Sequence, residues 1–291
     1  MRSLLFVPGD SPRKQEKGLR SGADALILDL EDSVAPASKQ GARTAIAEML
    51  LANAGTGPLL FVRVNDYATA LTEADLAAVM PARPAGIVLP KAVGVDDVSR
   101  LDAALSVHEA ANGIADGATR IVPLITETAQ ALLLEATHGQ RNARLSGITW
   151  GAEDPSASVG AASYRDTAGR LTPLFQHART MTLLAASAAG VAAIDTVYPD
   201  FRDEAGFSRE CDEALRDGFT AKMAIHPAQV PIINVAFAPS VEALAHARAI
   251  VTAFAAANDA GVVAIGGKMY DRPHRLLAER LLKTHCGSTS N

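Results

Sequence analysis

The chain has 291 residues, of which 48% are hydrophobic, and a net charge of −5 from 27 basic and 32 acidic residues. This length suits one large α/β barrel, since such barrels run to about 250 residues. No block of like charge predicts a nucleic-acid partner, and no apolar run approaches the roughly 20 residues of a membrane span. Cys211 and Cys286 belong to no metal-type cluster, and the first apolar stretch ends at Pro8. A cytoplasmic protein with free thiols is therefore expected.

Eight short apolar runs predict eight β-strands. They are Ser3–Val7, Ala25–Leu30, Leu59–Val64, Gly86–Leu89, Ile121–Thr126, Leu145–Trp150, Val191–Val197 and Lys222–Ile225. Most lack period-two alternation, as expected of parallel strands that are covered on both faces. Ala- and Leu-rich helical stretches separate them, which predicts an α/β fold, a closed (β/α)8 TIM barrel over residues 1–235. An open doubly wound sheet is the alternative, although the first strand–helix turn lacks a G-x-G-x-x-G segment.

Residues 236–291 exceed what a barrel needs. The segment Ser240–Ala257 predicts a helix, and its apolar stripe is Val241, Leu244, Ala247, Val251 and Phe254. A Gly-rich hinge follows at Gly261, Gly266 and Gly267. The last predicted helix, His274–Lys283, carries a second stripe of Leu276, Leu277, Leu281 and Leu282. We expect a C-terminal helical lid, because lids with Gly-containing hinges commonly exclude water from a site.

Polar side chains follow five of the predicted strands. They are Asp29, Glu31 and Asp32 after the second strand, Arg63 in the third, Lys91 after the fourth, Glu127 after the fifth and Asp154 after the sixth. The carboxyl ends of barrel strands share one face, where active sites lie. We therefore expect these side chains to surround one cavity.

Glu127 and Asp154 are the best pair of metal ligands. They lie 154 − 127 = 27 residues apart and follow consecutive predicted strands. Two carboxylates with no His or Cys nearby favour a hard cation such as Mg²⁺, with Mn²⁺ as a possible substitute. The alternative is that each is a helix N-cap or a first-turn acid, stabilised by the helix dipole.

Arg63 lies inside an apolar strand, where a guanidinium without a partner is costly. It should therefore meet a carboxylate of the protein or of a substrate. Its planar fork suits a two-point grip on a 2-oxo acid or a developing enolate oxygen. A structural ion pair with Asp29 or Glu31 is the alternative.

The acidic run after the second strand predicts support for the metal's waters or for Arg63, because partners of the ligands are part of a metal site. We assign this supporting role to Asp29, Glu31, Asp32 and Lys91. A solvated loop with helix-capping acids is the alternative.

Two further segments are candidates for substrate contacts. Free N–H groups at Gly151 and Ala152, ahead of a predicted helix, suit a substrate carboxylate. Arg13 and Lys14, at the start of the first predicted helix, suit a phosphate group, although a solvated surface face is equally consistent with the pattern.

Eight segments together carry a family resemblance. They are 5–9 (LFVPG), 28–32 (LDLED), 62–65 (VRVN), 89–91 (LPK), 151–154 (GAED), 193–198 (AIDTVY), 225–227 (IHP) and 267–269 (GKM). In this order they resemble the citrate lyase beta chain/malyl-CoA lyase group of the HpcH/HpaI aldolase superfamily, over nearly the whole chain.

The resemblance implies a Mg²⁺-dependent barrel that cleaves or forms a carbon–carbon bond in a 3-hydroxyacyl-CoA. It implies Mg²⁺ ligation by Glu127 and Asp154, and substrate contacts from Arg63 and Glu127. It also implies that Asp271 is a catalytic lid residue acting on the site of an adjacent subunit. The chain is then expected to form a homo-oligomer, a trimer or a multiple of it.

The loop 162–173 (ASYRDTAGRLTP) bears on the substrate. It departs from the Arg-Thr-Glu-Arg-Ser-Pro-Glu-Gly type of segment that is associated with true citrate lyase beta chains. This favours a malyl-, methylmalyl- or citramalyl-type thioester, cleaved to an acyl-CoA and a 2-oxo acid such as glyoxylate or pyruvate. A citryl thioester lyase subunit and a non-catalytic CoA-ester-binding barrel are the alternatives.

Overall fold

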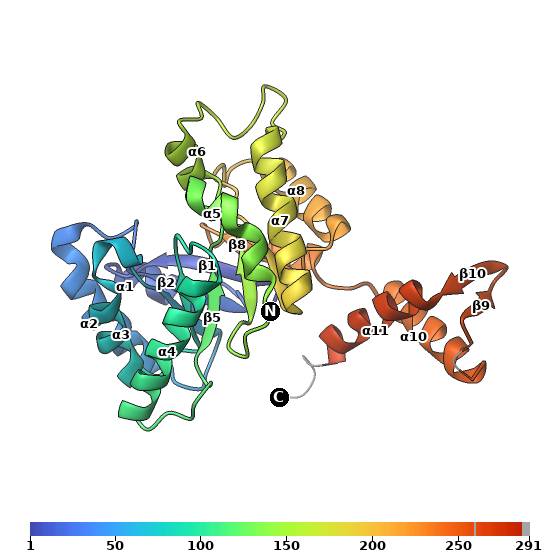
Figure 1. Ribbon diagram of the computed structural model, residues 1–291, viewed down its shortest axis with the longest axis horizontal. Coiled ribbons are helices and arrows are strands. Elements are labelled where there is room, and N and C mark those ends of the chain that lie inside the picture. Colours follow the sequence, from blue (N-terminus) through green and yellow to red (C-terminus); the bar gives the residue numbers. More distant parts are fainter. Residues whose placement is uncertain (259, 287–291) are drawn as a thin grey trace. The chain divides into compact units, whose positions relative to one another are not determined.

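A computed structural model describes residues 1–258 and 260–286. The chain divides into two compact units, the first comprising Met1–Phe237 and the second beginning at Ala238 (Figure 1). Each unit is described by itself, because their relative placement is not determined.

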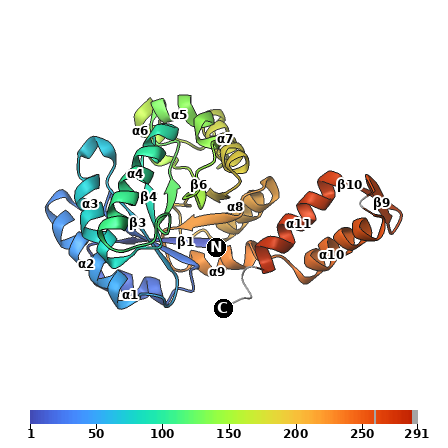
Figure 2. The same ribbon diagram turned by 60° about the horizontal axis from the view of Figure 1, so that its bottom comes forward.

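Eight parallel strands form the first unit's sheet (Figure 2). They are β1 (Ser3–Pro8), β2 (Ala25–Asp29), β3 (Leu59–Arg63), β4 (Gly86–Leu89), β5 (Arg120–Pro123), β6 (Gly147–Thr149), β7 (Ala192–Asp195) and β8 (Ala221–Ala224). Their order is β5-β4-β3-β2-β1-β8-β7-β6. Isolated parallel bridges, Ile121 to Leu145 and Leu124 to Thr149, join β5 to β6. The predicted (β/α)8 barrel is therefore confirmed, and the open-sheet alternative is wrong.

Helices surround the strands on the outside of the barrel (Figures 1 and 2). The α-helices of this unit are α1 (Pro12–Leu19), α2 (Lys39–Ala52), α3 (Thr72–Val79), α4 (Val95–Ala111), α5 (Ala129–Leu134), α6 (Glu153–Val159), α7 (Pro173–Ala189), α8 (Glu204–Asp217) and α9 (Gln229–Ala236). Short 3₁₀ turns lie at Pro36–Ser38 (η1), Tyr67–Thr69 (η2), Met80–Ala82 (η3) and Glu135–Gly139 (η4).

Alternation along each strand divides the core into two layers. One set of side chains packs between the strands and the helices, as Leu26 and Leu28 of β2 do. The other set fills the barrel interior, and its buried members are Leu4, Ala25, Ile27, Phe61, Val88, Val122, Leu124, Ile194, Ala221 and Met223. In the same register, Asp29 of β2 pairs with Arg63 of β3. The alternation thus carries both charged groups to the carboxyl-terminal mouth of the barrel.

The second unit contains α10 (Val241–Ala256), a two-stranded antiparallel sheet of β9 (Val262–Ile265) and β10 (Lys268–Asp271), and α11 (Arg272–Cys286). The predicted hinge is wrong at Gly266 and Gly267, which form the turn of this hairpin. Their φ values are 57° and 77°, and a tight turn between paired strands favours glycine at such angles.

The apolar stripes of the second unit also differ from expectation. The unit's buried hydrophobic cluster comprises Ala247, Ile250, Phe254, Val263 and Ala278, and Leu244 of the predicted stripe is also buried. Val241 was expected in the stripe but is 79% exposed, and Leu276 and Leu277 of α11 are 51% and 64% exposed. Helix α11 packs against α10. Part of its leucine stripe nevertheless faces outward.

One stretch, Gln229–Ala256, is long and apolar enough to cross a membrane by length and composition alone. The structure divides it into α9 and α10, which have 8 and 16 residues. Neither helix reaches the roughly 20 residues that a span needs.

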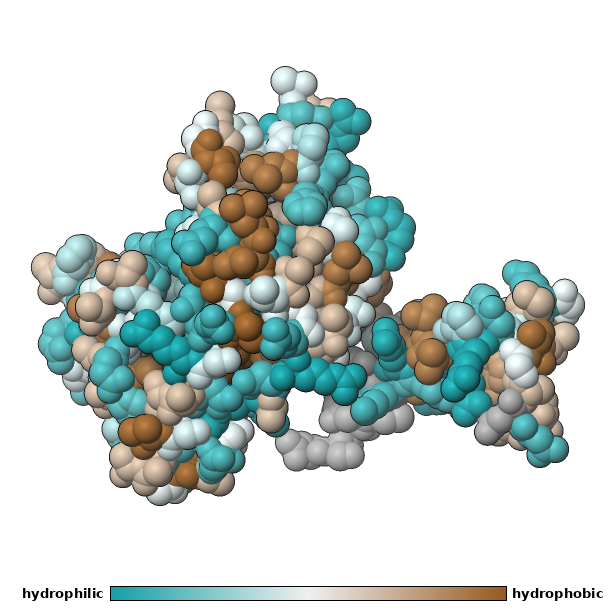
Figure 3. All heavy atoms as spheres, in the orientation of Figure 1, coloured by the Kyte–Doolittle hydropathy of each residue, from teal (hydrophilic) through white to brown (hydrophobic). Residues whose placement is uncertain are grey.

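On the barrel unit, Figure 3 shows apolar side chains gathered over α5, where Leu133 is 86% exposed.

Candidate active site

Arg63 is held at the barrel mouth by a two-point contact with Asp29. Its Nε and Nη2 donate to Asp29 Oδ1 and Oδ2 at 2.7 and 2.8 Å, and its guanidinium lies 4.9 Å from the Phe6 ring centre. Asp29 also accepts the backbone N–H of Glu31 at 2.9 Å and of Ser33 at 3.1 Å. Burial alone raises the pKa of Asp29, but these bonds and the Arg63 charge hold it below its usual value.

Glu31 continues the cluster on the other side of Arg63. Its Oε2 lies 2.9 Å from Arg63 Nη1, and its Oε1 accepts from Lys91 Nζ. Burial raises the pKa of Glu31 to about 7, although both cations oppose the shift. Asp32 is more exposed and lies 3.6 Å from Arg63 Nη1 and 3.7 Å from Lys91 Nζ.

This geometry leaves part of the Arg63 guanidinium for a ligand. Two of its five N–H groups donate to Asp29, while Nη1 forms an ion pair with Glu31 Oε2, a buried oxygen that accepts no hydrogen bond from the described residues. Among the residues that the structure describes, Arg63 donates no further hydrogen bond. The expected supporting pairs are present, and so is the ion pair that was the alternative for Arg63. The structural pair and a substrate contact are therefore compatible.

Lys91 connects this cluster to the two candidate metal ligands. Its φ of 49° is in the left-handed region, which is uncommon for a residue with a side chain. In this conformation its backbone N–H donates to Glu127 Oε2 at 2.6 Å, while its Nζ lies 3.7 Å from Asp154 Oδ1. Strained backbone conformations of this kind concentrate at functional sites.

Glu127 is 3% exposed, and burial raises its pKa to about 8. The charges of Glu31 and Asp154 add to this shift, whereas Arg63 opposes it. Glu127 does not cap a helix, because α5 is capped by Thr128, whose Oγ1 accepts from Ala131 N–H at 3.0 Å. The negative charge of the buried Glu127 carboxylate is thus not fully balanced by the positive charge around it.

Asp154 and Gly151 complete the mouth from the β6 side. Asp154 lies in the first turn of α6 with its side chain 35% exposed, so the helix-dipole alternative describes its position. Gly151 packs so closely that a Cβ there would lie 3.2 Å from Glu127 Cγ. The expected free N–H of Gly151 is not free, since it donates to Thr126 Oγ1 at 3.1 Å. Ala152 is buried at the N-cap of α6.

The donor set of the mouth fits a hard divalent cation. Its charged side chains are Asp29, Glu31, Asp32, Glu127, Asp154, Arg63 and Lys91, five carboxylates against two basic groups. Across residues 1–258 and 260–286 there is no cluster of three or more His, Cys, Asp or Glu side chains set to hold a metal. Two carboxylates suffice for Mg²⁺, which keeps its other positions for water or substrate oxygens.

Arg13, Lys14 and Asp271 are the remaining predicted site residues. Arg13 and Lys14 are exposed in the first turn of α1. Asp271 belongs to the second unit, where it ends β10 just before α11. Its carboxylate lies 2.5 Å from His274 Nδ1, and this hydrogen bond lowers its pKa.

Sequence reasoning missed the contacts of two lysine side chains. Lys39 Nζ donates to the carbonyl oxygens of Leu30 and Glu31 at 2.6 and 2.7 Å, which holds the acidic loop in place. Lys222 of β8 is fully buried and bonds Asp195 and Glu210 at 3.0 and 2.8 Å. A lysine within an apolar strand was the available signal, because such a group requires partners.

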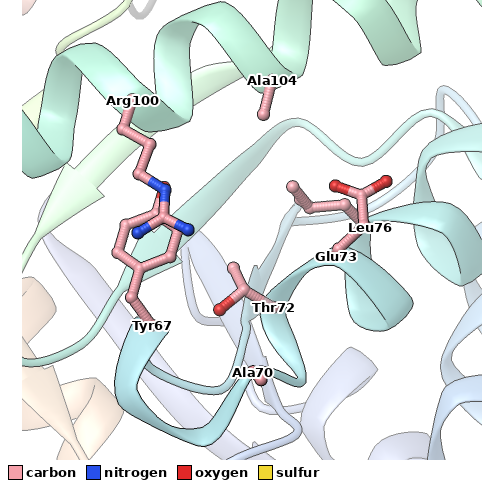
Figure 4. A pocket seen from close by; sticks show the side chains of 7 residues that line it. All are labelled: Tyr67, Ala70, Thr72, Glu73, Leu76, Arg100 and Ala104. Carbon is pink, nitrogen blue, oxygen red and sulfur yellow. The ribbon is translucent and has the colours of Figure 1, made fainter.

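A separate cavity of about 240 Å³ lies between α3 and α4 (Figure 4). The Arg100 guanidinium stacks 3.9 Å from the centre of the Tyr67 ring, and burial raises the pKa of Tyr67 to about 12. None of the predicted site residues lines this cavity.

The HpcH/HpaI aldolase/citrate lyase family matches residues 2–227. The chain belongs to this family. It is 35% identical over 286 residues to a citrate lyase subunit beta-like protein of Mycobacterium tuberculosis, covering 98% of this chain and 96% of that protein. It is also 35% identical over 285 residues to the mitochondrial citramalyl-CoA lyase of Rattus norvegicus, covering 94% and 82% of the two chains.

One solved structure of this family matches nearly the whole chain. The protein CitE of Mycobacterium tuberculosis, in complex with magnesium, acetoacetate and coenzyme A, superposes with a TM-score of 0.76. Its sequence is 34% identical, and the match covers 97% of each chain. The resemblance expected from the eight sequence segments is confirmed.

Proposed function

We propose that this protein is a Mg²⁺-dependent carbon–carbon lyase that reversibly cleaves a short 3-hydroxyacyl-CoA of the malyl, methylmalyl or citramalyl type. The products are an acyl-CoA and a 2-oxo acid. The solved relative with magnesium, acetoacetate and coenzyme A supports the cofactor and the ligand class. The citramalyl-CoA lyase relative supports the reaction class.

One observation in the structure carries the proposal. The Arg63 guanidinium, whose Nη1 donates no hydrogen bond among the described residues, lies in one cluster with the carboxylates of Glu127 and Asp154, joined to them through Lys91. A 2-oxo acid is an anion with adjacent carboxylate and carbonyl oxygens, and it needs a cationic donor together with a metal site. Glu127 and Asp154 would hold Mg²⁺, with Mn²⁺ as a substitute.

When bound, Mg²⁺ supplies Lewis-acid polarisation of the oxo-acid carbonyl. In synthesis, the carboxylate of Asp271 removes a proton from carbon 2 of the acyl-CoA, and that carbon attacks the carbonyl carbon of the oxo acid. The remaining N–H groups of Arg63 stabilise the charge that develops on the carbonyl oxygen. The resulting alkoxide takes a proton from solvent to become the 3-hydroxyl group. In cleavage, the hydroxyl proton is lost to solvent, the carbon–carbon bond breaks, and Asp271 returns a proton to the acyl-CoA carbon.

We further propose a homo-oligomer, a trimer or a multiple of it, in which Asp271 of one chain completes the site of another. The exposed Leu276 and Leu277 of α11 support an intermolecular contact, because they add apolar surface outside the unit's own core. Inactive Asp271→Ala chains mixed with inactive Glu127→Ala chains should regain partial activity after subunit exchange. A mixture that stays inactive while mass spectrometry shows exchange would rule out shared sites.

The main test is turnover of the purified protein with a panel of acyl-CoAs and 2-oxo acids, with Mg²⁺ or with EDTA. We expect Mg²⁺-dependent release of acyl-CoA and oxo acid from malyl-, methylmalyl- or citramalyl-CoA. Turnover of a carrier-linked citryl thioester alone would identify a citrate lyase subunit. Thioester binding without turnover of any substrate would indicate the non-catalytic barrel.

A further inference from the structure

The segment 150–165 carries Asp154 and connects β6 to the loop before α7. It begins at Trp150, which is 1% exposed, and includes the short helix α6. It ends in a tight hairpin-like loop, in which Thr172 N–H donates to the Tyr164 carbonyl and Asp166 N–H donates to the Arg170 carbonyl. The seven-residue helix is held on the β5 side by Gly151 N–H, which donates to Thr126 Oγ1, and by Ser158 Oγ, which accepts from Ala129 N–H. The two ends hold the segment on the β7 and β8 side.

The first end is fixed by a hydrogen bond to Asp195. Trp150 Nε1 donates to Asp195 Oδ1 at 2.8 Å, while Asp195 Oδ2 accepts from Lys222 Nζ at 3.0 Å. Both Asp195 and Lys222 are buried. The indole of Trp150 therefore bonds a charged group that is itself neutralised and held in place.

The second end is fixed by Arg165. Its Nη2 lies 2.5 Å from Glu210 Oε2, and its Nη1 donates to the carbonyl of Gly169 at 2.8 Å. The guanidinium lies 5.3 and 5.6 Å from the ring centres of Tyr164 and Tyr198. This one side chain thus joins the loop to helix α8.

The two ends meet at one ammonium group. Lys222 Nζ contacts Asp195 and also donates to Glu210 Oε1 at 2.8 Å and to the Thr196 carbonyl at 2.8 Å. Its three donors are thereby satisfied. A buried ammonium is held where all its donors find acceptors, so it fixes the spacing of both carboxylates.

We propose that Lys222, Asp195 and Glu210 form a clamp that holds both ends of the segment 150–165 and so positions Asp154 for metal binding. Arg165 is the positioning residue that closes the clamp at the loop end. The inference deepens the proposed function and rests on it for the role of Asp154. It adds a set of residues, outside the barrel mouth, that sets metal affinity.

Arg165→Met is the variant that tests the clamp with the smallest risk to folding. The side chain of Arg165 is 23% exposed, and Lys222 keeps Glu210 paired after the change. Arg170→Met is the matched control. It removes an arginine from the same loop, 77% exposed, whose ion pair with Asp166 does not touch the clamp.

The readout is the affinity of the substrate-free protein for Mn²⁺ alone, measured by electron paramagnetic resonance. We expect Arg165→Met to weaken Mn²⁺ binding about tenfold, in line with the effect of removing supporting partners of metal ligands. Arg165→Lys should recover part of the loss, and Arg170→Met should bind as wild type does. The Mg²⁺ concentration for half-maximal activity should rise in the same order.

The outcomes separate this inference from the proposed function. Wild-type Mn²⁺ affinity in Arg165→Met, in protein with an unchanged thermal transition, would overturn the clamp and leave the lyase proposal standing. A wild-type protein that binds no Mn²⁺ would overturn the metal site and the clamp with it. Equal losses in Arg165→Met and Arg170→Met would assign the effect to the loop as a whole and also overturn the clamp.

Discussion

Two ionic clusters of the barrel unit differ in charge balance. The mouth cluster has five carboxylates around Arg63 and Lys91. The cluster between β8 and the outer helices pairs three carboxylates with three cations, and its members are Asp195, Glu210, Asp217, Lys222, Arg165 and Arg179.

The balance decides how each carboxylate titrates. Burial acts to raise the pKa in both places, but Lys222 and Arg179 hold the pKa of Asp195 below its usual value. At the mouth, burial and neighbouring carboxylates raise the pKa of Glu127 to about 8. A cluster that supports the fold satisfies its own charges, whereas a cluster that binds a cation leaves charge for it.

The largest expected effect comes from removing a charge at the mouth. Glu127→Gln should abolish Mg²⁺-dependent turnover, because a neutral amide is a poor ligand for a hard cation. It should also stabilise the metal-free protein, since the buried repulsion disappears while the acceptor for Lys91 N–H remains. Steady-state assays and thermal unfolding in EDTA measure the two effects. Turnover retained at ordinary Mg²⁺ would remove Glu127 from the ligand set.

The opposite result is expected in the balanced cluster. Lys222→Met leaves Asp195 and Glu210 without their shared ammonium and should cost about 3–5 kcal/mol of unfolding free energy. Lys91→Met is the comparison, because its ammonium is 25% exposed and its loss should reduce activity far more than stability. Denaturant unfolding of both variants measures the two stability losses. Similar losses would show that the two clusters do not differ in their contribution to stability.

Arg63→Lys tests the geometry of the mouth at constant charge. An ammonium cannot reproduce the two-point contact with Asp29 while offering N–H groups to a substrate. The expected loss in kcat is about 10²–10³-fold, the usual effect of one lost donor to developing charge. Activity within a few-fold of wild type would make Arg63 a purely structural ion-pair residue.

A smaller effect concerns a buried carboxylate that belongs to neither cluster. Glu135 of η4 is 1% exposed, and burial raises its pKa to about 8. Because the folded-state pKa is raised, the stability associated with Glu135 is fully present below about pH 4.5 and is lost as the pH rises toward and through 8. Glu135→Gln should therefore flatten the fall in melting temperature between pH 5 and 9.

The control for this prediction is Glu213→Gln, at an exposed position of α8. It should keep the wild-type pH profile of the melting temperature. If Glu135→Gln keeps that profile too, the carboxylate of Glu135 is not buried as the structure shows.

The sequence predicted all eight strands of the barrel, because buried parallel strands are continuous apolar runs. The ends of the strands differ from the prediction, and β6 covers only Gly147–Thr149 of the predicted Leu145–Trp150. Leu145 still faces β5, but through an isolated bridge. The hairpin β9–β10 was missed because paired glycines are equally consistent with a hinge and with a tight turn.

Strand-end placement predicted which charged residues meet at the mouth, because that follows from topology. It could not predict the left-handed backbone at Lys91, which turns its N–H toward Glu127. Nor could it show that Thr126 occupies the N–H of Gly151. These details depend on side-chain rotamers and on tertiary contacts that leave no periodic signal in the sequence.

The junction between β5 and β6 has a kinetic consequence. Every other neighbouring pair of strands forms a regular ladder, whereas this one relies on isolated bridges. Glu127 follows β5 and Asp154 follows β6, so a cation that both residues bind would fasten the seam from either side. Amide hydrogens that cross the seam, such as those of Ile121, Ile125 and Ser146, should exchange faster than those of the β1–β2 ladder. Adding Mg²⁺ should slow the exchange of these amides selectively. The cofactor would then also help to close the barrel between β5 and β6.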